Sequence, residues 1–302
     1  MRIGAHLPLA VLGDARPTSE DLQVYTRTAN DLGYTMLAAN DHLIWGKPWL
    51  DGPTTLASVI SASGDMTLAT SITLPVVRHP VVVAKMLTTL ASLSVGRVVG
   101  GLGPGSSRAD YEAVGIPFEE RWARFDEALR TVRALVRGEP TSPGTYYGNE
   151  ARLNPIPARH LEIWFASWGS DRRLAAMAEV ADGWFASGYN ATPHQYEESR
   201  ARLDGHLHSA GRAPGVFPDA VATMWLFVTE SRREAEHVRD DVLAPTLGRD
   251  PAQLAHLPIG SAQHCSEALA AYAAAGAREV LLWPIRDGLH QLERGMQVAS
   301  SL

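Results

Sequence analysis

Short apolar runs alternate with amphipathic segments along the whole chain. The apolar runs predict β-strands, at residues 2–7, 34–39, 66–74, 97–102, 161–166, 183–186, 220–228 and 279–283. The segments between them predict helices, at residues 19–32, 53–63, 80–93, 119–137, 171–181, 192–208, 232–243, 263–275 and 288–300. Repeated strand–helix units with short connections indicate an α/β fold, a parallel (β/α)8 TIM barrel with loop insertions. An open doubly wound sheet is the alternative, and it requires a reversal of strand order.

The same pattern predicts one domain over residues 1–302, because α/β barrels of this length are common. Ser19 is expected to cap the first helix, with Gly33 just past its end. Residues 138–160 contain prolines, glycines and two tyrosines, and they predict an irregular insertion or hairpin over the barrel. A second candidate insertion covers residues 211–218.

Composition narrows the functional class. The net charge of -6 disfavours a nucleic-acid partner, which would need a basic surface. The single cysteine, Cys265, excludes an intramolecular disulfide and fits a reducing cytoplasm. No apolar stretch is long enough for a secretion signal or a membrane span, so we expect a cytoplasmic protein without a membrane partner. No metal-binding motif is present, and no metal is expected.

Candidate chemistry lies where the predicted strands end, because active sites of such barrels form there. The second strand ends in Asn40, Asp41 and His42, and Trp45 and Trp49 follow. Histidine changes charge near neutral pH and is a natural proton donor or acceptor. The alternative is a capped loop with a locally bonded histidine. His6 ends the first strand, and it either reaches the barrel mouth or is a core histidine.

Glycines and serines follow the fourth and fifth strands. The segment 100–105 is rich in glycine, which lets backbone approach a ligand closely, but its spacing differs from a dinucleotide fingerprint. Ser106 follows it. Residues 166–170 precede a helix with Arg173 in its first turn, an arrangement that suits a phosphate. A simple serine-capped helix is the alternative there.

Together these stretches resemble the luciferase-like family of flavin- and deazaflavin-dependent oxidoreductases. The resemblance covers most of the chain and rests on the order of several segments, at residues 40–42, 68–80, 84–94, 96–103, 111–121, 181–184 and 259–276. It implies a (β/α)8 barrel in which the cofactor ring lies against a bulge at the end of the third strand. The ring would contact Thr70, Ser71 and Ile72, and the resemblance implies a cis peptide bond between Ser71 and Ile72.

The resemblance also implies roles for the strand-end residues. Asp41 would contact the cofactor, and His42 would handle a proton near its hydride-carrying carbon. His6, Trp45 and Trp49 would face the substrate. The cofactor phosphate would be held by the loops after strands four and five, at Gly103, Pro104, Gly105, Ser106, Ala166, Ser167, Trp168, Gly169 and Arg173.

These implications predict an enzyme, an oxidoreductase that transfers a hydride between coenzyme F420 and a small organic substrate. The alternative is an FMN-dependent monooxygenase that uses O2. A third hypothesis is a barrel that binds a flavin-like ligand without turnover. Two departures argue against a sugar-phosphate substrate: Ser106 stands where that branch has a glutamate, and Trp45 is closer to His42 than the family tryptophan. Family members are commonly dimers, so a homodimer is possible.

Overall fold

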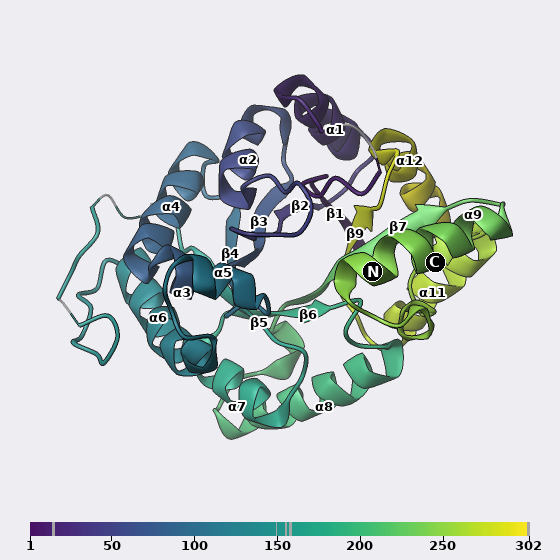
Figure 1. Ribbon diagram of the computed structural model, residues 1–302. Coiled ribbons are helices and arrows are strands. Elements are labelled where there is room, and N and C mark those ends of the chain that lie inside the picture. The colour runs from purple at the N-terminus through teal and green to yellow at the C-terminus, as the bar shows by residue number, and fades with distance from the viewer. Residues whose placement is uncertain (14–15, 149, 155, 157–158, 301–302) are drawn as a thin grey trace.

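Eight parallel strands form a closed barrel (Figure 1). The computed structural model describes residues 1–13, 16–148, 150–154, 156 and 159–300. The barrel strands are β1 (Arg2–His6), β2 (Met36–Ala39), β3 (Thr67–Thr73), β4 (Val98–Leu102), β5 (Glu162–Ala166), β6 (Gly183–Ser187), β7 (Asp219–Val228) and β9 (Glu279–Pro284). Each pairs with its neighbours in this order, and β9 pairs with β1 to close the ring. The predicted (β/α)8 barrel is therefore confirmed.

Helices surround this barrel (Figure 1). The α-helices are α1 (Ser19–Asp31), α2 (Gly52–Ser58), α3 (Pro75–Arg78), α4 (Pro80–Leu93), α5 (Arg108–Ala113), α6 (Arg121–Val136), α7 (Asp171–Val180), α8 (Pro193–Ser209), α9 (Arg232–Glu236), α10 (Ala244–Leu247), α11 (Ala262–Ala274) and α12 (Gly288–Ala299). Shorter turns are the 3-10 helices η1 (Ile60–Ala62), η2 (Phe118–Glu120), η3 (Pro214–Val216) and η5 (Pro251–Leu254), and the π-helix η4 (His237–Leu243).

Three details differ from the sequence-based expectation. The first helix is capped by Thr18 rather than Ser19, because Thr18 and Asp21 form a reciprocal capping box. The helix expected over 232–243 becomes π-helical after Glu236. A two-residue strand, β8 (Ile259–Gly260), pairs with the end of β7 outside the barrel. Thr18 and Asp21 have the spacing of a capping box, so the local sequence could have indicated that cap. The π-helical turn and β8 depend on which partner the backbone finds.

The insertion between α6 and β5 lies on the outside of the barrel, beside α4 and α6 (Figure 1). The Glu127 carboxylate accepts hydrogen bonds from the backbone N–H groups of Thr145, Tyr146 and Tyr147. The Tyr147 ring also lies 5.3 Å from the ring of His79, the residue before α4. The described part of the segment therefore packs beside the barrel wall, against α6 and the start of α4, rather than over the barrel as expected. Residues 149, 155 and 157–158 of the expected insertion lie outside the described residues.

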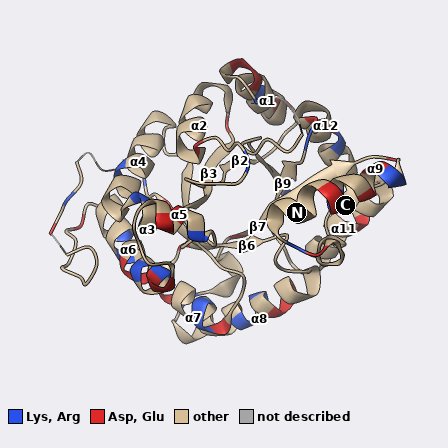
Figure 2. Ribbon diagram, in the orientation of Figure 1, with Lys and Arg blue, Asp and Glu red and all other residues tan. Residues whose placement is uncertain are grey.

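The barrel interior is packed with small and large apolar side chains, namely Met36, Ala38, Ala69, Val99, Trp164, Phe185, Ala220, Ala222 and Leu281. Charged residues lie mainly on the outer helices (Figure 2). The interior is therefore a filled core, and space for a ligand remains only toward the ends of the strands. Among the described helices, none has the length and hydropathy needed to cross a membrane.

Candidate active site

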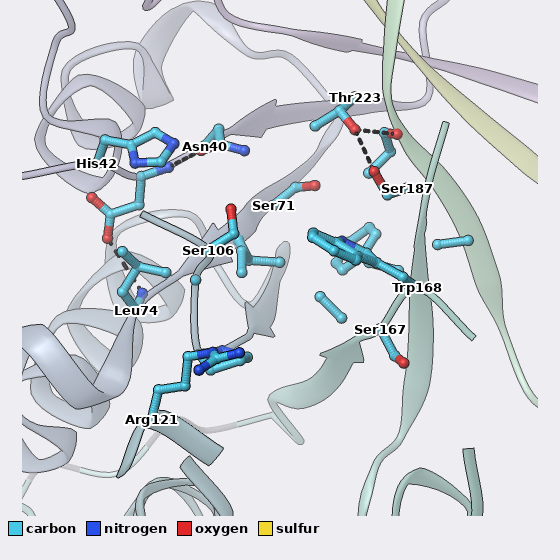
Figure 3. A pocket seen from close by; sticks show the side chains of 18 of the residues that line it. Asn40, His42, Ser71, Leu74, Ser106, Arg121, Ser167, Trp168, Ser187 and Thr223 are labelled. Carbon is cyan, nitrogen blue, oxygen red and sulfur yellow. Dashed lines mark hydrogen bonds between the residues drawn. The ribbon is translucent and has the colours of Figure 1, made fainter. Parts of the chain in front are cut away.

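A cavity of about 440 Å³ opens at the C-terminal ends of β2 to β7. Its lining residues come from seven segments of the chain: Asn40, Asp41, His42, Ser71, Ile72, Leu74, Pro104, Gly105, Ser106, Phe118, Arg121, Trp122, Ala166, Ser167, Trp168, Ser170, Phe185, Ala186, Ser187, Tyr189, Ala222 and Thr223. The lining is mostly apolar, with separate polar groups, as is typical of small-molecule sites. Figure 3 shows His42, Arg121 and Thr223 at three different ends of this space.

His42 is held from behind by a buried carboxylate. Its Nδ1 lies 2.8 Å from Oδ2 of Asp110, and Oδ1 of the same carboxylate accepts hydrogen bonds from the N–H groups of Leu43 and Ile44. The Trp45 ring lies at a centroid distance of 4.2 Å from the imidazole. Among the residues that the structure describes, none bonds to Nε2 of His42. That nitrogen is therefore free for a ligand in the cavity.

Asp41 forms an ion pair with Arg78 at the same strand end. The guanidinium donates through Nε at 2.7 Å and Nη2 at 2.6 Å to the two carboxylate oxygens. Arg78 also pairs with Asp51, the cap of α2. Burial alone lowers the pKa of Arg78, but the hydrogen bonds and charges of Asp41 and Asp51 outweigh it and raise the pKa. The guanidinium therefore remains charged and ties the loop after β2 to helix α3.

Replacing Arg78 by methionine is expected to lower the free energy of unfolding by ~3–5 kcal/mol, because it leaves the fully buried Asp41 carboxylate without its cation. Denaturant titration measures this loss. The double variant R78M with Asp41→Asn removes the orphaned charge and is expected to recover part of the stability. A loss below about 1 kcal/mol in R78M would contradict this expectation, because it would show that the ion pair stabilises the protein no more than an exposed surface pair does.

The end of β3 is irregular. The pairing register with β4 shifts between Thr70 and Thr73, and the peptide bond between Ser71 and Ile72 is cis, which confirms that prediction. Ser71 and Ile72 line the cavity, whereas the hydroxyl of Thr70 donates to the Gly101 carbonyl at 3.0 Å, away from it. The buried Oγ of Ser71 has no hydrogen-bond partner in the described chain. It is a polar atom at the cavity floor that a ligand can satisfy.

The glycine-rich loop after β4 brings backbone close to this floor. Pro104, Gly105 and Ser106 line the cavity. Gly105 has φ 77°, which glycine adopts readily, and a Cβ there would lie 2.9 Å from the Leu74 side chain. Gly103 lies behind Ile72 and does not line the cavity. A larger residue at position 105 would therefore collide with Leu74, so glycine allows the loop to lie this close to that side chain.

Arg121 provides a positive charge at the opposite end of the cavity from His42 (Figure 3). Its guanidinium lies 4.1 Å from the centre of the Phe118 ring and donates to the Phe118 carbonyl at 3.2 Å. No carboxylate within the described part of the chain forms an ion pair with it. Ser106, Ser167 and Ser170 lie along the same cavity. A cation with nearby hydroxyl groups suits a phosphate.

Arg173, the arginine that the sequence suggested for a phosphate, does not line the cavity. It forms a 2.7 Å ion pair with Asp126, and its guanidinium lies 4.0 Å from the centre of the Trp122 ring. It therefore supports Trp122, which does line the cavity. Ala166, Ser167 and Trp168, which the resemblance assigned to the cofactor, line the cavity, but Gly169 does not.

The three residues expected to face the substrate lie behind the cavity wall. His6 is fully buried, its ring stacks on Trp283 at 4.5 Å, and its Nε2 accepts from the N–H of Thr223 at 3.1 Å. Burial lowers the pKa of His6 to about 3, so the ring is neutral. Trp45 and Trp49 pack around His42 and do not line the cavity.

The wall made by β6 and β7 contains hydroxyl groups that the sequence did not single out. Ser187 Oγ lies 3.3 Å from Thr223 Oγ1 (Figure 3). It also accepts a hydrogen bond from Asn190 Nδ2 at 2.9 Å. Thr223 has φ 55°, which is uncommon for a β-branched residue and often marks a functional site. Ser187 ends a strand, so the strand-end rule could have found it. Thr223 lies inside β7, where no sequence pattern signals a bulge.

The described residues include no group of three or more His, Cys, Asp or Glu side chains placed to hold a metal ion. The polar groups of the cavity include instead the His42 imidazole, the Arg121 guanidinium, the ion-paired Asp41 carboxylate, the Asn40 amide and several hydroxyls. This set can move a proton, bind an anion and orient a neutral molecule.

Known proteins share this sequence and fold. The chain is 35% identical over 181 residues to an F420-dependent glucose-6-phosphate dehydrogenase of Beutenbergia cavernae, an alignment that covers 55% of this chain and 52% of the relative. It therefore spans about half the length of that relative. A protein of the same name from Intrasporangium calvum is 33% identical over 256 residues, covering 78% of this chain and 68% of the relative.

The fold matches that of an F420-dependent secondary alcohol dehydrogenase solved with an F420–acetone adduct, with a TM-score of 0.85, 16% identity, and coverage of 99% of this chain and 98% of the other. At this identity the likeness concerns the fold alone. The sequence profile of the luciferase-like monooxygenase family matches residues 1–279. The chain therefore belongs to the luciferase-like monooxygenase family.

Proposed function

We propose that the protein transfers a hydride between coenzyme F420 and a small, uncharged organic substrate. One observation carries this proposal: a single cavity has an imidazole with a free nitrogen at one end and an arginine without a carboxylate partner at another. The first suits proton transfer, and the second suits the phosphate of a cofactor. The names of the related F420-dependent dehydrogenases support F420 as the cofactor.

Three features of the described cavity fit a flat ring joined to a phosphate. The Ser71 hydroxyl at the floor has no partner and can bond to a ring heteroatom. Gly105 lets the backbone of the loop after β4 lie close to Leu74, which also lines the cavity. Arg121 can then hold the phosphate at the end of the cavity shown away from His42 in Figure 3, and Ser106 lines the cavity between the two. Both carboxylate oxygens of Asp41 accept a hydrogen bond from Arg78. In the expected contact with the cofactor, an oxygen of Asp41 would accept a further hydrogen bond through another of its lone pairs.

The deazaflavin, when bound, supplies the redox chemistry, as cofactors do. The residues of this chain orient the substrate and handle its proton. When a substrate alcohol is oxidised, Nε2 of His42 would take the hydroxyl proton; when a carbonyl is reduced, the same nitrogen would return it. Asp110, hydrogen-bonded to Nδ1, faces the positive charge that the ring then gains. Trp45, packed against the imidazole, keeps water from one face of it.

The substrate end of the cavity favours a neutral molecule. Asn40, Ser187 and Thr223 present amide and hydroxyl groups there (Figure 3). Arg121 is the one lysine or arginine among the lining residues of the described chain, and we assign it to the cofactor. A phosphorylated substrate would need a second cation, because Arg121 would already pair with the cofactor phosphate. The departures at Ser106 and Trp45 agree with this inference.

The experiment that tests the proposal titrates the purified protein with F420 and with FMN under the same conditions. We expect F420 to bind at least about tenfold more tightly. The F420 complex is then supplied with short secondary alcohols or with glucose 6-phosphate, and loss of F420 absorbance is followed. The proposal predicts reduction with the alcohols and none with the sugar phosphate. Tighter binding of FMN, with O2 consumption by the reduced form, would instead support the monooxygenase assignment.

A further inference from the structure

Asp110 lies behind the cavity rather than in it. It belongs to the short helix α5, and only 1% of its surface is exposed. Lysine and arginine side chains of the described chain form no ion pair with it. Its three hydrogen-bonding partners all come from the loop after β2: Nδ1 of His42 and the N–H groups of Leu43 and Ile44, each at 2.8 Å. This buried carboxylate therefore forms its hydrogen bonds with the loop after β2.

These contacts determine which imidazole nitrogen carries the proton. An ionised carboxylate can only accept hydrogen bonds, so Nδ1 of His42 must donate to Oδ2 of Asp110. In the neutral ring the lone pair is then on Nε2. Trp45 packs on the ring at 4.2 Å, and Trp49 approaches it edge-on at 4.8 Å. Rotation of the imidazole would break both the hydrogen bond and this packing.

We propose that Asp110 is a positioning residue, which keeps His42 in the Nδ1–H tautomer so that the Nε2 lone pair faces the cavity. The inference rests on the proposed function, in which Nε2 exchanges a proton with the substrate. The same carboxylate stabilises the imidazolium that forms when Nε2 accepts that proton. Asp110 itself does not line the cavity and touches no ligand there.

The variant Asp110→Asn tests the proposal with almost no change in shape. The N–H groups of Leu43 and Ile44 both require an acceptor, so they select the amide oxygen of the asparagine. The amide NH2 group then faces Nδ1 of His42, where it can only donate. Nδ1 must become the acceptor, and the proton moves to Nε2. The substitution therefore presents an N–H to the substrate in place of a lone pair.

Nitrogen-15 NMR of histidine-labelled protein, at a pH where the ring is neutral, reads the tautomer directly. We expect a protonated Nδ1 in the unmodified protein and a protonated Nε2 in D110N. Turnover of D110N should fall by about 10²- to 10⁴-fold with little change in KM or in F420 affinity. A protonated Nε2 in the unmodified protein would overturn the proposal even if D110N failed to fold.

The exposed pair of His237 and Asp241 provides a matched control, because Nδ1 of His237 also lies 2.8 Å from an aspartate oxygen. Asp241→Asn should leave both the His42 signal and turnover unchanged. Full activity of D110N with an unaltered tautomer would overturn the positioning role while leaving the proposed function intact. Full activity of a variant that lacks the His42 imidazole would instead contradict the proposed function itself.

Discussion

Replacing His42 by alanine is expected to lower turnover by about 10²- to 10⁴-fold while F420 affinity changes by less than about threefold. The imidazole lines the cavity, its Nε2 bonds to no described residue, and it is the group that we propose to exchange the proton. The cofactor phosphate would lie at the other end, near Arg121, so its binding should not depend on His42 (Figure 3). Steady-state kinetics with a secondary alcohol, together with an F420 titration, separates the two effects.

A histidine on the outer surface serves as the control. His194 lies on α8 with a side chain that is 78% exposed, and His194→Ala should leave turnover within about twofold of the unmodified enzyme. Addition of free imidazole to H42A is expected to restore part of the activity, because it supplies the missing proton acceptor. Unchanged turnover in H42A would contradict the proposed function, in which His42 exchanges the proton with the substrate.

Replacing Arg121 by glutamine is expected to weaken F420 binding by about 10- to 100-fold, the usual effect of losing a charged hydrogen bond. The phosphate-free deazaflavin riboside, in contrast, should bind to this variant with the same affinity as to the unmodified protein. The difference between the two ligands isolates the phosphate contribution. It should shrink at high ionic strength, because the cavity is open to solvent and salt screens such charges.

Arg108 offers a matched control on the same aromatic ring. Its guanidinium also lies over Phe118, at 4.9 Å, but it is exposed and paired with Glu119. Arg108→Gln should therefore bind F420 within about twofold of the unmodified protein. If R121Q weakened the riboside and the complete cofactor equally, Arg121 would act by shaping the cavity rather than by binding the phosphate.

Position along the strands was the most informative property of the sequence. Parallel strands point their C-terminal ends to one face, so His42, Ser71 and Ser167 could be expected to converge although they are far apart in the chain. The structure brings all three to one cavity. His6 obeys the same rule and ends a strand, but the bulge at Thr223 provides a hydrogen bond that keeps its ring inside the core.

Partners that depend on tertiary contacts could not be read from the chain. Arg173 has the local features of a phosphate ligand, yet Asp126 on α6 neutralises it. Arg121 begins α6, and its access to the cavity depends on how η2 and α6 pack. Asp110 lies 68 residues from His42, and nothing in either segment signals their contact. Sequence periodicity predicts elements, whereas these pairings arise only when the elements meet.

A crystal structure of the protein with F420 bound tests the central claim most directly. The account predicts a ring that lies against Ser71 and Ile72, a phosphate in contact with Arg121, and Nε2 of His42 facing the space beside the ring. A cofactor that binds elsewhere, or an imidazole turned away from the ring, would contradict it.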